Sequence, residues 1–410
     1  MKRYITGKPV CDVKDIIPDG KDYILILDEG CFSCLDEIAQ KRPVAALSDY
    51  NLFFSHIPAF FQMLSIPLIF MPENKNRAYA AYYERAHGLI DNNRTDIIST
   101  IEEVRNLHRI TIDTYLSVAY LGGVGNANTH DTINSINKVD GFQVLTSIKS
   151  IDEGKFSCVN SDGIGMIFSE FIFFNYKKYP TCDEQRSTLE MIFKKNPSEH
   201  YTVRLFDIKY DKIPKWLHGV KLEENDNPLF EKFFYSYLVE QLKCLCDLAE
   251  KYPIFIIIPG IRDLNDIIYI RKCIDNVESS YGHLLKIGVL IENVSVVEKM
   301  PCMLDIVDFF SVGSSDLTSS FFGKHRTHIY DPDQLARILN DDNYYQLLAN
   351  IKLFSSSKHI RIAGQLPVFP GCLEKLIVIG YRHFSVNPYL VGQIKYQIRN
   401  LISLTCSDVK

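Results

Sequence analysis

The sequence lacks the features that mark membrane, secreted and nucleic-acid-binding proteins. No apolar run approaches the roughly 18–20 residues of a membrane span, and residues 1–10 lack the apolar core of a signal peptide. A positive charge balance is also absent, because 45 basic residues face 50 acidic ones, for a formal net charge of −5. A nucleic-acid backbone requires a basic face. We therefore expect a cytoplasmic protein with neither a membrane nor a nucleic acid as its partner.

A disulfide framework and a zinc pattern are missing too. The 11 cysteines are scattered and odd in number, and several stand in apolar or helical surroundings, which indicates reduced thiols. Cys31 and Cys34 form a C-x-x-C pair, but no second pair follows at zinc spacing, which disfavours a metal or redox role. There is no internal repeat and no low-complexity segment. A globular α/β chain of 410 residues suggests two or three domains.

Residues 1–95 are expected to form a small α/β unit. Short apolar runs predict strands, and amphipathic segments between them predict helices. The predicted strands are 23–30, 42–49 and 67–71, and the predicted helices are 34–42 and 55–66. Residues 96–116 then carry apolar positions at a helical period without a breaker, which predicts a helical linker between two domains.

The remaining residues, 117–410, are predicted to form a (β/α)₈ barrel. Short apolar runs recur there with helical or loop material between them, as expected for parallel strands that are buried on both faces. The predicted strands are 117–123, 163–168, 201–208, 254–260, 286–292, 306–313, 359–364 and 382–387. This span is not far above the usual barrel size of about 250 residues. Residues 137–160 are long for a first connection and are interpreted as an insertion.

Two consecutive runs of this predicted barrel end in carboxylates. Glu292 closes one of them, and Asp316 comes just after the next. The carboxyl ends of barrel strands form the active-site face. Mg²⁺ takes few protein carboxylates and shares its other positions with water and phosphate oxygens. The pair therefore predicts a Mg²⁺ site, which Mn²⁺ could also fill; the alternative is that strand ends are polar because they meet solvent.

Six phrases of the sequence resemble the motifs of one family. They are GIGMIFSEF, YTVRLFDIK, GVLIENVS, VGSSDLTSS, AGQLPVFP and SVNPYLV, in the family's order and spacing. The family is that of phosphoenolpyruvate-utilising enzymes, which includes phosphoenolpyruvate synthase, pyruvate phosphate dikinase and enzyme I of the sugar phosphotransferase system. The resemblance covers residues 117–401 and implies phosphoryl transfer at a metal-dependent barrel site.

The amino-terminal unit resembles the family's swivelling phosphohistidine domain, through ALSDYNLFFSHIPAFFQMLSIPLIF at residues 46–70. This resemblance implies that His56 carries the phosphoryl group. The alternative is a histidine that merely starts a helix, buried against Phe53 and Phe54. No stretch of the sequence resembles the family's ATP-grasp domain, so a separate ATP-grasp protein is the expected phosphoryl donor.

The resemblance also implies roles for residues of the barrel. Glu292 and Asp316 match the two metal carboxylates, and Arg204 matches an arginine that grips phosphate with its planar fork. The alternative for Arg204 is an ion pair with Asp207 or Glu170. Further candidates for substrate or phosphate binding are Arg262, Arg326, Gln365 and Asn387, although Arg326 is equally compatible with a surface arginine.

The sequence departs from the family at positions that carry its chemistry. Phe168 and Phe233 replace two phosphate-binding arginines, and Ala363 replaces the cysteine that protonates the pyruvate enolate. Each well-placed donor at a transferring group is worth several kcal/mol, and no obvious acid remains for the carbon centre. Interconversion of pyruvate and phosphoenolpyruvate is therefore not expected. The phosphohistidine motif is altered as well, at Asn51, Leu52, Phe54 and Gln62.

Three hypotheses follow. We favour a diverged phosphotransferase, in which His56 delivers a phosphoryl group to a small-molecule oxygen acceptor, other than pyruvate, at the metal site. The second is a catalytically silent relative that acts as a binding or regulatory subunit. The third is a barrel enzyme with a more apolar substrate, in a pocket lined by Phe168 and Phe233. Members of the family dimerise through the barrel, so a homodimer is expected.

Overall fold

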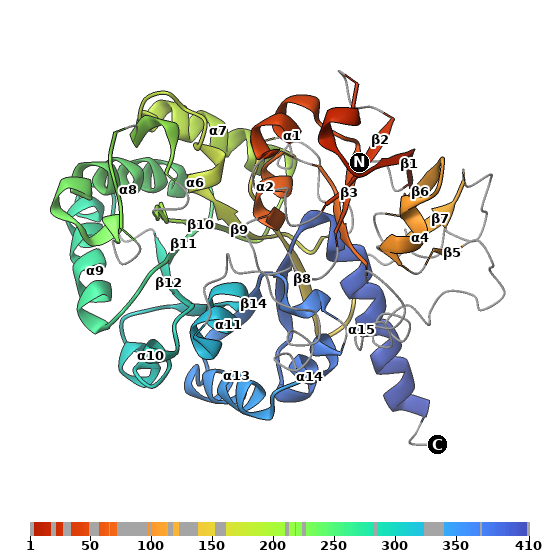
Figure 1. Ribbon diagram of the computed structural model, residues 1–410. Coiled ribbons are helices and arrows are strands. Elements are labelled where there is room, and N and C mark those ends of the chain that lie inside the picture. Colours follow the sequence, from red (N-terminus) through yellow and green to blue (C-terminus); the bar gives the residue numbers. More distant parts are fainter. Residues whose placement is uncertain are drawn as a thin grey trace.

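The computed structural model contains an amino-terminal sheet and a closed barrel (Figure 1). The residues that it describes are 4–17, 22–27, 34–48, 57–64, 66–71, 97–98, 100–113, 118–122, 138–151, 161–209, 213–217, 219–223, 227–282, 285–323, 340–369 and 371–407. None of the helices in these ranges is both long enough and apolar enough to cross a membrane.

The amino-terminal part is built on a seven-stranded sheet in the order β4-β3-β2-β1-β6-β7-β5. Four of its strands are parallel neighbours: β1 (Tyr4–Val10), β2 (Tyr23–Ile26), β3 (Ala45–Ser48) and β4 (Leu68–Phe70). The helices α1 (Leu35–Lys41) and α2 (Ile57–Met63) follow β2 and β3, and the 3₁₀ turn η1 (Val13–Asp15) follows β1. The strands and helices predicted between residues 23 and 71 are therefore confirmed.

The continuous helix predicted over residues 96–116 is wrong. The described residues of this stretch form β5 (Ile97–Ile98), the short helix α4 (Ile101–Arg105) and β6 (Ile110–Asp113). Ile110, Thr111 and Ile112 are all β-branched, and they pair with β1 in an antiparallel ladder. The apolar spacing fitted a helix, but β propensity and pairing with β1 decided the structure.

The first barrel strand also differs from the predicted one. Val118–Leu121 is β7, which pairs with β6 and belongs to the amino-terminal sheet. The barrel begins at β8 (Gln143–Ile148), inside the stretch 137–160 that the sequence predicted as an insertion. The polar residues Thr146 and Ser147 conceal this strand in the sequence. Both are buried, and the hydroxyl groups of Ser147 and Ser385 are hydrogen-bonded at 2.8 Å.

Eight parallel strands close the barrel in the order β10-β11-β12-β13-β14-β15-β8-β9. After β8 they are β9 (Ile164–Phe168), β10 (Tyr201–Arg204), β11 (Ile254–Ile258), β12 (Lys286–Ile291), β13 (Phe309–Gly313), β14 (His359–Ala363) and β15 (His383–Val386). The predicted (β/α)₈ architecture is confirmed, and every predicted run except the first contains one of the barrel strands.

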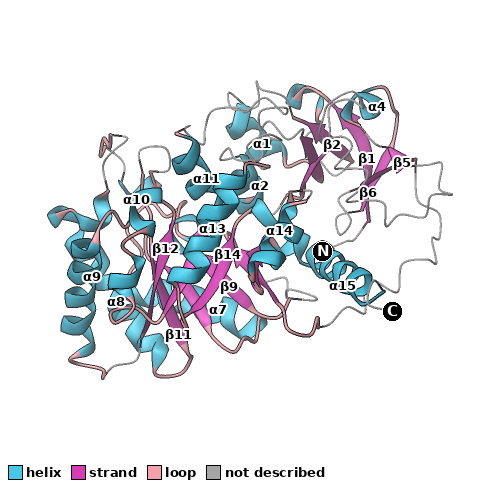
Figure 2. Ribbon diagram, turned by 90° about the horizontal axis from the view of Figure 1, so that it is seen from below, coloured by secondary structure: helices cyan, strands magenta, loops and turns pink. Residues whose placement is uncertain are grey.

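Helices surround the strands (Figure 2). The longer ones are α7 (Cys182–Lys195), α8 (Tyr235–Ala249), α9 (Leu264–Glu278), α11 (Ser314–Phe322), α13 (Asp342–Phe354), α14 (Cys372–Ile379) and α15 (Val391–Ser407). Single turns lie in the loops: α6 (Ser169–Ile172), η4 (Lys215–Leu217), η5 (Pro228–Phe230), η6 (Lys232–Phe234), α10 (Val294–Val297), η7 (Met300–Met303), η8 (Leu366–Val368) and η9 (Pro388–Leu390). Residues at helical spacing on α8, such as Leu238, Leu242 and Leu245, are buried.

The amino-terminal part and the barrel share buried contacts. Leu47 and Ile69 of the sheet belong to the same apolar core as Ile148 of β8. Gln62 of α2 is only 2% exposed and donates a hydrogen bond to the Ser147 carbonyl at 2.7 Å. Because Ser147 lies near the carboxyl end of β8, α2 is anchored at the end of the barrel where active sites of this fold form.

The amino-terminal end of the barrel holds three histidines beside a buried arginine. His200 precedes β10, and His359 and His383 begin β14 and β15, with their two rings 4.2 Å apart. Arg361 is fully buried and donates a hydrogen bond to the Gly165 carbonyl at 2.6 Å. Burial, together with nearby cationic groups, lowers the pKa of His200 to about 4 and that of His359 to about 3. Near neutral pH these two rings are neutral in the folded protein.

These histidines predict an acid-sensitive fold. Below the ordinary histidine pKa of 6.5, the unfolded chain binds protons that the folded rings do not, so stability is lost as the pH falls from 6.5 toward 4. We expect the melting temperature to drop by about 2–6 °C between about pH 7 and pH 5. The drop should be smaller in His359→Gln and unchanged in His108→Gln, which alters an exposed histidine. Thermal melts of the three proteins decide this, and equal drops in all three contradict it.

Candidate functional site

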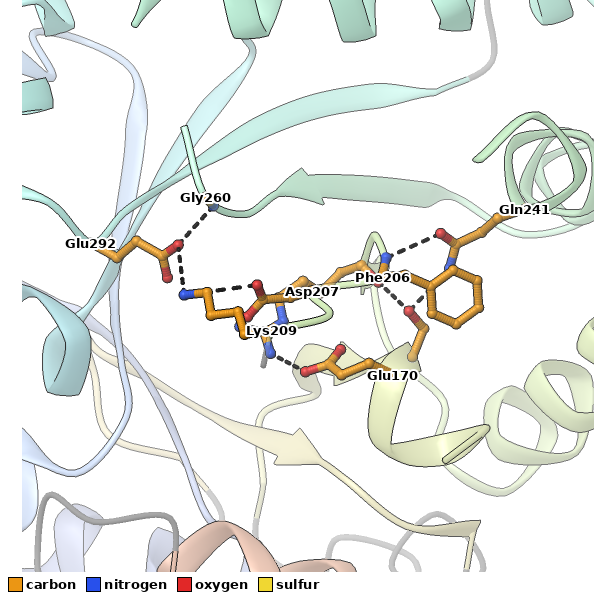
Figure 3. Close-up of polar contacts among 9 residues, drawn as sticks. Glu170, Phe206, Asp207, Lys209, Gln241, Gly260 and Glu292 are labelled. Atoms are coloured by element: carbon orange, nitrogen blue, oxygen red, sulfur yellow. Dashed lines mark hydrogen bonds and ion pairs between the residues drawn. The ribbon is translucent and has the colours of Figure 1, made fainter. Parts of the chain in front are cut away.

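Glu292 directly follows β12, and its carboxylate points toward Lys209 (Figure 3). The residue is 7% exposed, and Oε1 accepts a hydrogen bond from the Gly260 backbone N–H at 2.7 Å. Oε2 is buried and accepts no hydrogen bond from the part of the chain that the structure describes. Burial raises the pKa of Glu292; the Lys209 ammonium opposes this, and the carboxylates of Asp316 and Asp207 add to it.

Asp316 lies one strand further along the barrel, in the first turn of α11 after β13. Its charge contributes to the raised pKa of Glu292, so the two carboxylates are within electrostatic reach of each other. The structure therefore brings the two residues predicted to hold Mg²⁺ to the same end of the barrel. Among the described residues, no three or more His, Cys, Asp or Glu side chains converge in a metal cluster. A buried carboxylate oxygen without a donor, beside a second carboxylate, fits a hard cation that keeps water and phosphate oxygens as its other ligands.

Arg204 ends β10 and is held in a buried network of ion pairs. Its guanidinium donates a hydrogen bond to Glu170 Oε1 and lies 3.2 Å from Asp207 Oδ2; Figure 3 shows both carboxylates. Burial alone would lower the pKa of Arg204, but the charges of Glu170 and Asp207 outweigh it and raise the pKa. The alternative that the sequence left open for Arg204, an ion pair inside the barrel mouth, is thus present with both carboxylates.

A second set of hydrogen bonds fixes the backbone around Arg204. The Ser169 hydroxyl donates to the Arg204 carbonyl at 2.6 Å, and Gln241 Nε2 donates to the Ser169 hydroxyl at 3.0 Å. Gln241 Oε1 in turn accepts the Phe206 N–H at 3.2 Å. Sequence reasoning missed Gln241. The signal that could have found it is a glutamine on the apolar face of α8, where a polar side chain needs a partner.

Lys209 was also missed by the sequence analysis. Its Nζ lies 3.8 Å from Asp207 Oδ1 and 3.9 Å from Glu292 Oε1, so it connects the Arg204 network to the carboxylate predicted to bind metal. Asp207 and Lys209 are two residues apart in an extended stretch, a spacing that directs both side chains to the same side. This spacing was visible in the sequence, but the position of Glu292 was not.

Phe168, which stands where the family resemblance expects an arginine, lies between two cations. The Arg204 guanidinium is 4.4 Å from the centre of the Phe168 ring, and the Lys149 ammonium is 4.7 Å from it. Lys149 comes directly after β8, so a second positive charge reaches this part of the barrel mouth from the neighbouring strand. The charge expected to be lost with the arginine is therefore partly supplied by Lys149.

Phe233 and Ala363 occupy two further positions where the family residue is replaced. Phe233 lies in η6, is 53% exposed, and packs edge-on against Phe234. Ala363 ends β14 and is buried in the barrel interior with Leu290 and Phe309. Phe168 is partly buried against that same interior group, whereas Phe233 is not part of it. The two phenylalanines therefore do not belong to one apolar cluster.

The remaining predicted site residues are placed as follows. Arg262 follows β11, its side chain is 54% exposed, and it is paired with Asp266 at 3.3 Å. Gln365 lies just after β14, and its buried Oε1 accepts no hydrogen bond from the described residues. Asn387 follows β15, and its carbonyl accepts the Leu390 N–H at 2.9 Å. Some residues that the sequence analysis named for the site or the phosphohistidine motif lie outside the described ranges: His56, Arg326, Asn51, Leu52, Phe53 and Phe54.

One family and several known proteins are similar to this chain. Residues 125–402 match the family described as "PEP-utilising enzyme, PEP-binding domain". The "Phosphoenolpyruvate-dependent phosphotransferase system" protein of Salmonella typhimurium is 24% identical over 263 residues, which make up 58% of this chain and 34% of that protein. The "Phosphoenolpyruvate-protein phosphotransferase" of Buchnera aphidicola is 22% identical, over 97% of this chain and 70% of that protein. The chain thus spans about a third of the length of the first of these relatives.

A solved structure, that of an HpcH/Hpal aldolase/citrate lyase family protein from Burkholderia cenocepacia, is similar over 69% of this chain and 100% of its own. The TM-score is 0.39 and the identity 12%, a level that carries no argument about function. The match at residues 125–402, by contrast, covers more than half of the chain and includes Arg204, Glu292 and Asp316. The chain belongs to the family of phosphoenolpyruvate-utilising enzymes.

Proposed function

We propose that the chain is a diverged phosphotransferase of this family, in which His56 carries a phosphoryl group to an acceptor held at the barrel mouth. The observation that carries the proposal is Glu292, whose buried Oε2 has no hydrogen-bond donor among the described residues and whose carboxylate is within electrostatic reach of Asp316. Two carboxylates at one rim of the barrel repel each other unless a cation offsets their charge. We assign Glu292 and Asp316 to Mg²⁺ or Mn²⁺, which would supply charge stabilisation for the transferring phosphoryl group.

Arg204 is the residue that we assign to the phosphate. Its guanidinium is oriented by Glu170, Asp207 and the ring of Phe168, so it is preorganised and loses little freedom when a ligand arrives. Its Nε is buried and has no hydrogen-bond partner among the described residues. That N–H group is the donor that we assign to a phosphate oxygen, and Lys149 adds a second positive charge beside Phe168.

The acceptor that suits this site is an oxygen nucleophile, such as a hydroxyl or a carboxylate, and not the carbon of pyruvate enolate. Ala363 cannot donate a proton, and it is packed against the apolar interior of the barrel. Transfer to oxygen requires no acid at a carbon centre. The loss of that acid is therefore compatible with phosphoryl transfer to a different small molecule.

The placement of α2 supports His56 as the carrier. Helix α2 begins at Ile57, the next residue in the sequence, and Gln62 anchors it to Ser147 at the carboxyl end of β8. This is the end of the barrel where Glu292 lies. We further propose that a separate ATP-grasp protein loads His56, that the chain is a homodimer through the barrel, and that it works in the cytoplasm.

Phosphohistidine labelling tests this proposal. The protein is incubated with Mg²⁺ and either labelled phosphoenolpyruvate or labelled ATP plus a candidate ATP-grasp protein. We expect acid-labile, base-stable label that disappears in His56→Ala and persists in His108→Ala, which replaces an exposed histidine between α4 and β6. Label that survives in His56→Ala, or no label with any donor, rules out the carrier role of His56.

A silent regulatory subunit is the second candidate. It is favoured by the replacement of the residues at 168, 233 and 363, which removes two arginines and an acid that the family uses. A subunit of this kind would need no metal, so Glu292→Ala would leave its biological activity intact. Turnover that depends on Mg²⁺ and on Glu292 excludes it.

A further inference from the structure

Lys209 lies at the centre of the polar contacts drawn in Figure 3, between two buried carboxylates. Its ammonium is 3.8 Å from Asp207 Oδ1 and 3.9 Å from Glu292 Oε1. The side chains of Asp207 and Glu292 are 4% and 5% exposed, whereas that of Lys209 is 32% exposed. The partly exposed ammonium of Lys209, on its flexible side chain, therefore lies between two buried carboxylates.

This arrangement gives Lys209 the electrostatic role of a metal ion. The carboxylates of Asp207 and Glu292 repel each other, and the Lys209 ammonium, which is 3.8 Å and 3.9 Å from them, offsets this repulsion. Both nitrogen–oxygen distances exceed the usual hydrogen-bond range of about 2.7–3.2 Å, so the contacts are charge pairs without fixed geometry. The Lys209 side chain is 32% exposed, and its four-carbon stem lets the ammonium move into solvent.

We propose that Lys209 is a tethered cation that competes with the divalent metal for Glu292. Metal entry displaces the ammonium from Glu292 and leaves it attached at the rim, where it can contact a phosphate oxygen. Lys209 therefore weakens the binding of the metal when no other ligand is present. When a phosphorylated ligand is bound, the displaced ammonium contacts its phosphate, and the metal binds more tightly. The metal and the phosphorylated ligand increase each other's affinity by the same factor. The inference rests on the proposed metal site at Glu292 and Asp316 and concerns what regulates it.

Binding of Mn²⁺, followed by electron paramagnetic resonance, tests this inference without any assay of activity. Lys209→Met removes the charge and keeps the apolar stem, and we expect it to bind Mn²⁺ about tenfold more tightly than the wild type. Lys209→Arg keeps the charge, so its affinity for Mn²⁺ should remain as low as that of the wild type. Lys286→Met is the matched control, because Lys286 also pairs with a carboxylate, Asp308 at 3.4 Å, but on the surface. It should leave the affinity unchanged.

A second arm adds inorganic phosphate. Phosphate should tighten Mn²⁺ binding in the wild type and lose most of this effect in Lys209→Met. Equal Mn²⁺ affinity in the wild type and Lys209→Met, with binding that still depends on Glu292, overturns the role of Lys209 and leaves the metal site in place. Absence of Mn²⁺ binding in both proteins, when their melting curves show that they are folded, overturns the metal site itself.

Discussion

Replacing Arg204 by methionine is expected to lower the free energy of unfolding by about 3–5 kcal/mol, because it leaves buried carboxylates without their cation. Glu170 and Asp207 are 1% and 4% exposed, and both contact the Arg204 guanidinium. The charges of these two carboxylates raise the pKa of Arg204 against the effect of its burial, so the three groups are strongly coupled. Urea unfolding of the wild type and the variant measures the difference.

The matched control for this prediction is Arg186→Met. Arg186 also lies between two carboxylates, Asp183 and Asp247, but its side chain is 41% exposed, so its loss should cost less than about 1 kcal/mol. Adding Glu170→Gln to Arg204→Met should restore part of the lost stability, because it removes one of the uncompensated charges. If Arg204→Met lost no more unfolding free energy than Arg186→Met, the buried network would not stabilise the barrel mouth.

Glu292→Gln is expected to weaken Mn²⁺ binding by at least about 100-fold, while the protein stays folded. The amide has the shape of the carboxylate and can still accept the Gly260 N–H. It also removes a buried charge that the environment disfavours, as the raised pKa of Glu292 shows. Stability should therefore be equal to or greater than that of the wild type, whereas the metal loses its charged ligand.

The control for this variant is Glu278→Gln. Glu278 is 2% exposed and accepts the Leu285 N–H at 2.8 Å, so it resembles Glu292 in burial and in its backbone partner. It lies at the end of α9, away from the carboxyl ends of the strands, and its replacement should not alter Mn²⁺ affinity. An Mn²⁺ affinity of Glu292→Gln equal to that of the wild type would show that Glu292 does not bind the metal.

The barrel was predictable because most of its strands are short apolar runs with clear ends. β8 was not predicted because Thr146 and Ser147 are polar, although both are buried in the structure. Ser147 is hydrogen-bonded there to Ser385, which is far away in the sequence. The prediction of a linker helix was wrong for a different reason. The apolar residues near Ile110 fit a helical period, but β propensity and pairing with β1 and β7 select a strand.

The candidate site was predictable to the extent that strand ends and family motifs define it. Glu292 and Asp316 could be named because each follows an apolar run. Lys209 could not, because its importance depends on a distance to Glu292 that arises only when β10 and β12 approach the same rim. The sequence also did not indicate that the Lys149 ammonium lies 4.7 Å from the ring of Phe168.

Calorimetric titration with phosphoenolpyruvate, with and without Mg²⁺, tests most directly whether the barrel remains a metal-dependent phosphate site. We predict that Mg²⁺ binds alone, that phosphoenolpyruvate binds only when Mg²⁺ is present, and that Glu292→Gln abolishes both. Binding of Mg²⁺ without phosphoenolpyruvate would contradict the phosphate site and favour a different substrate. Binding of neither by the folded protein would contradict the account as a whole and favour a silent subunit.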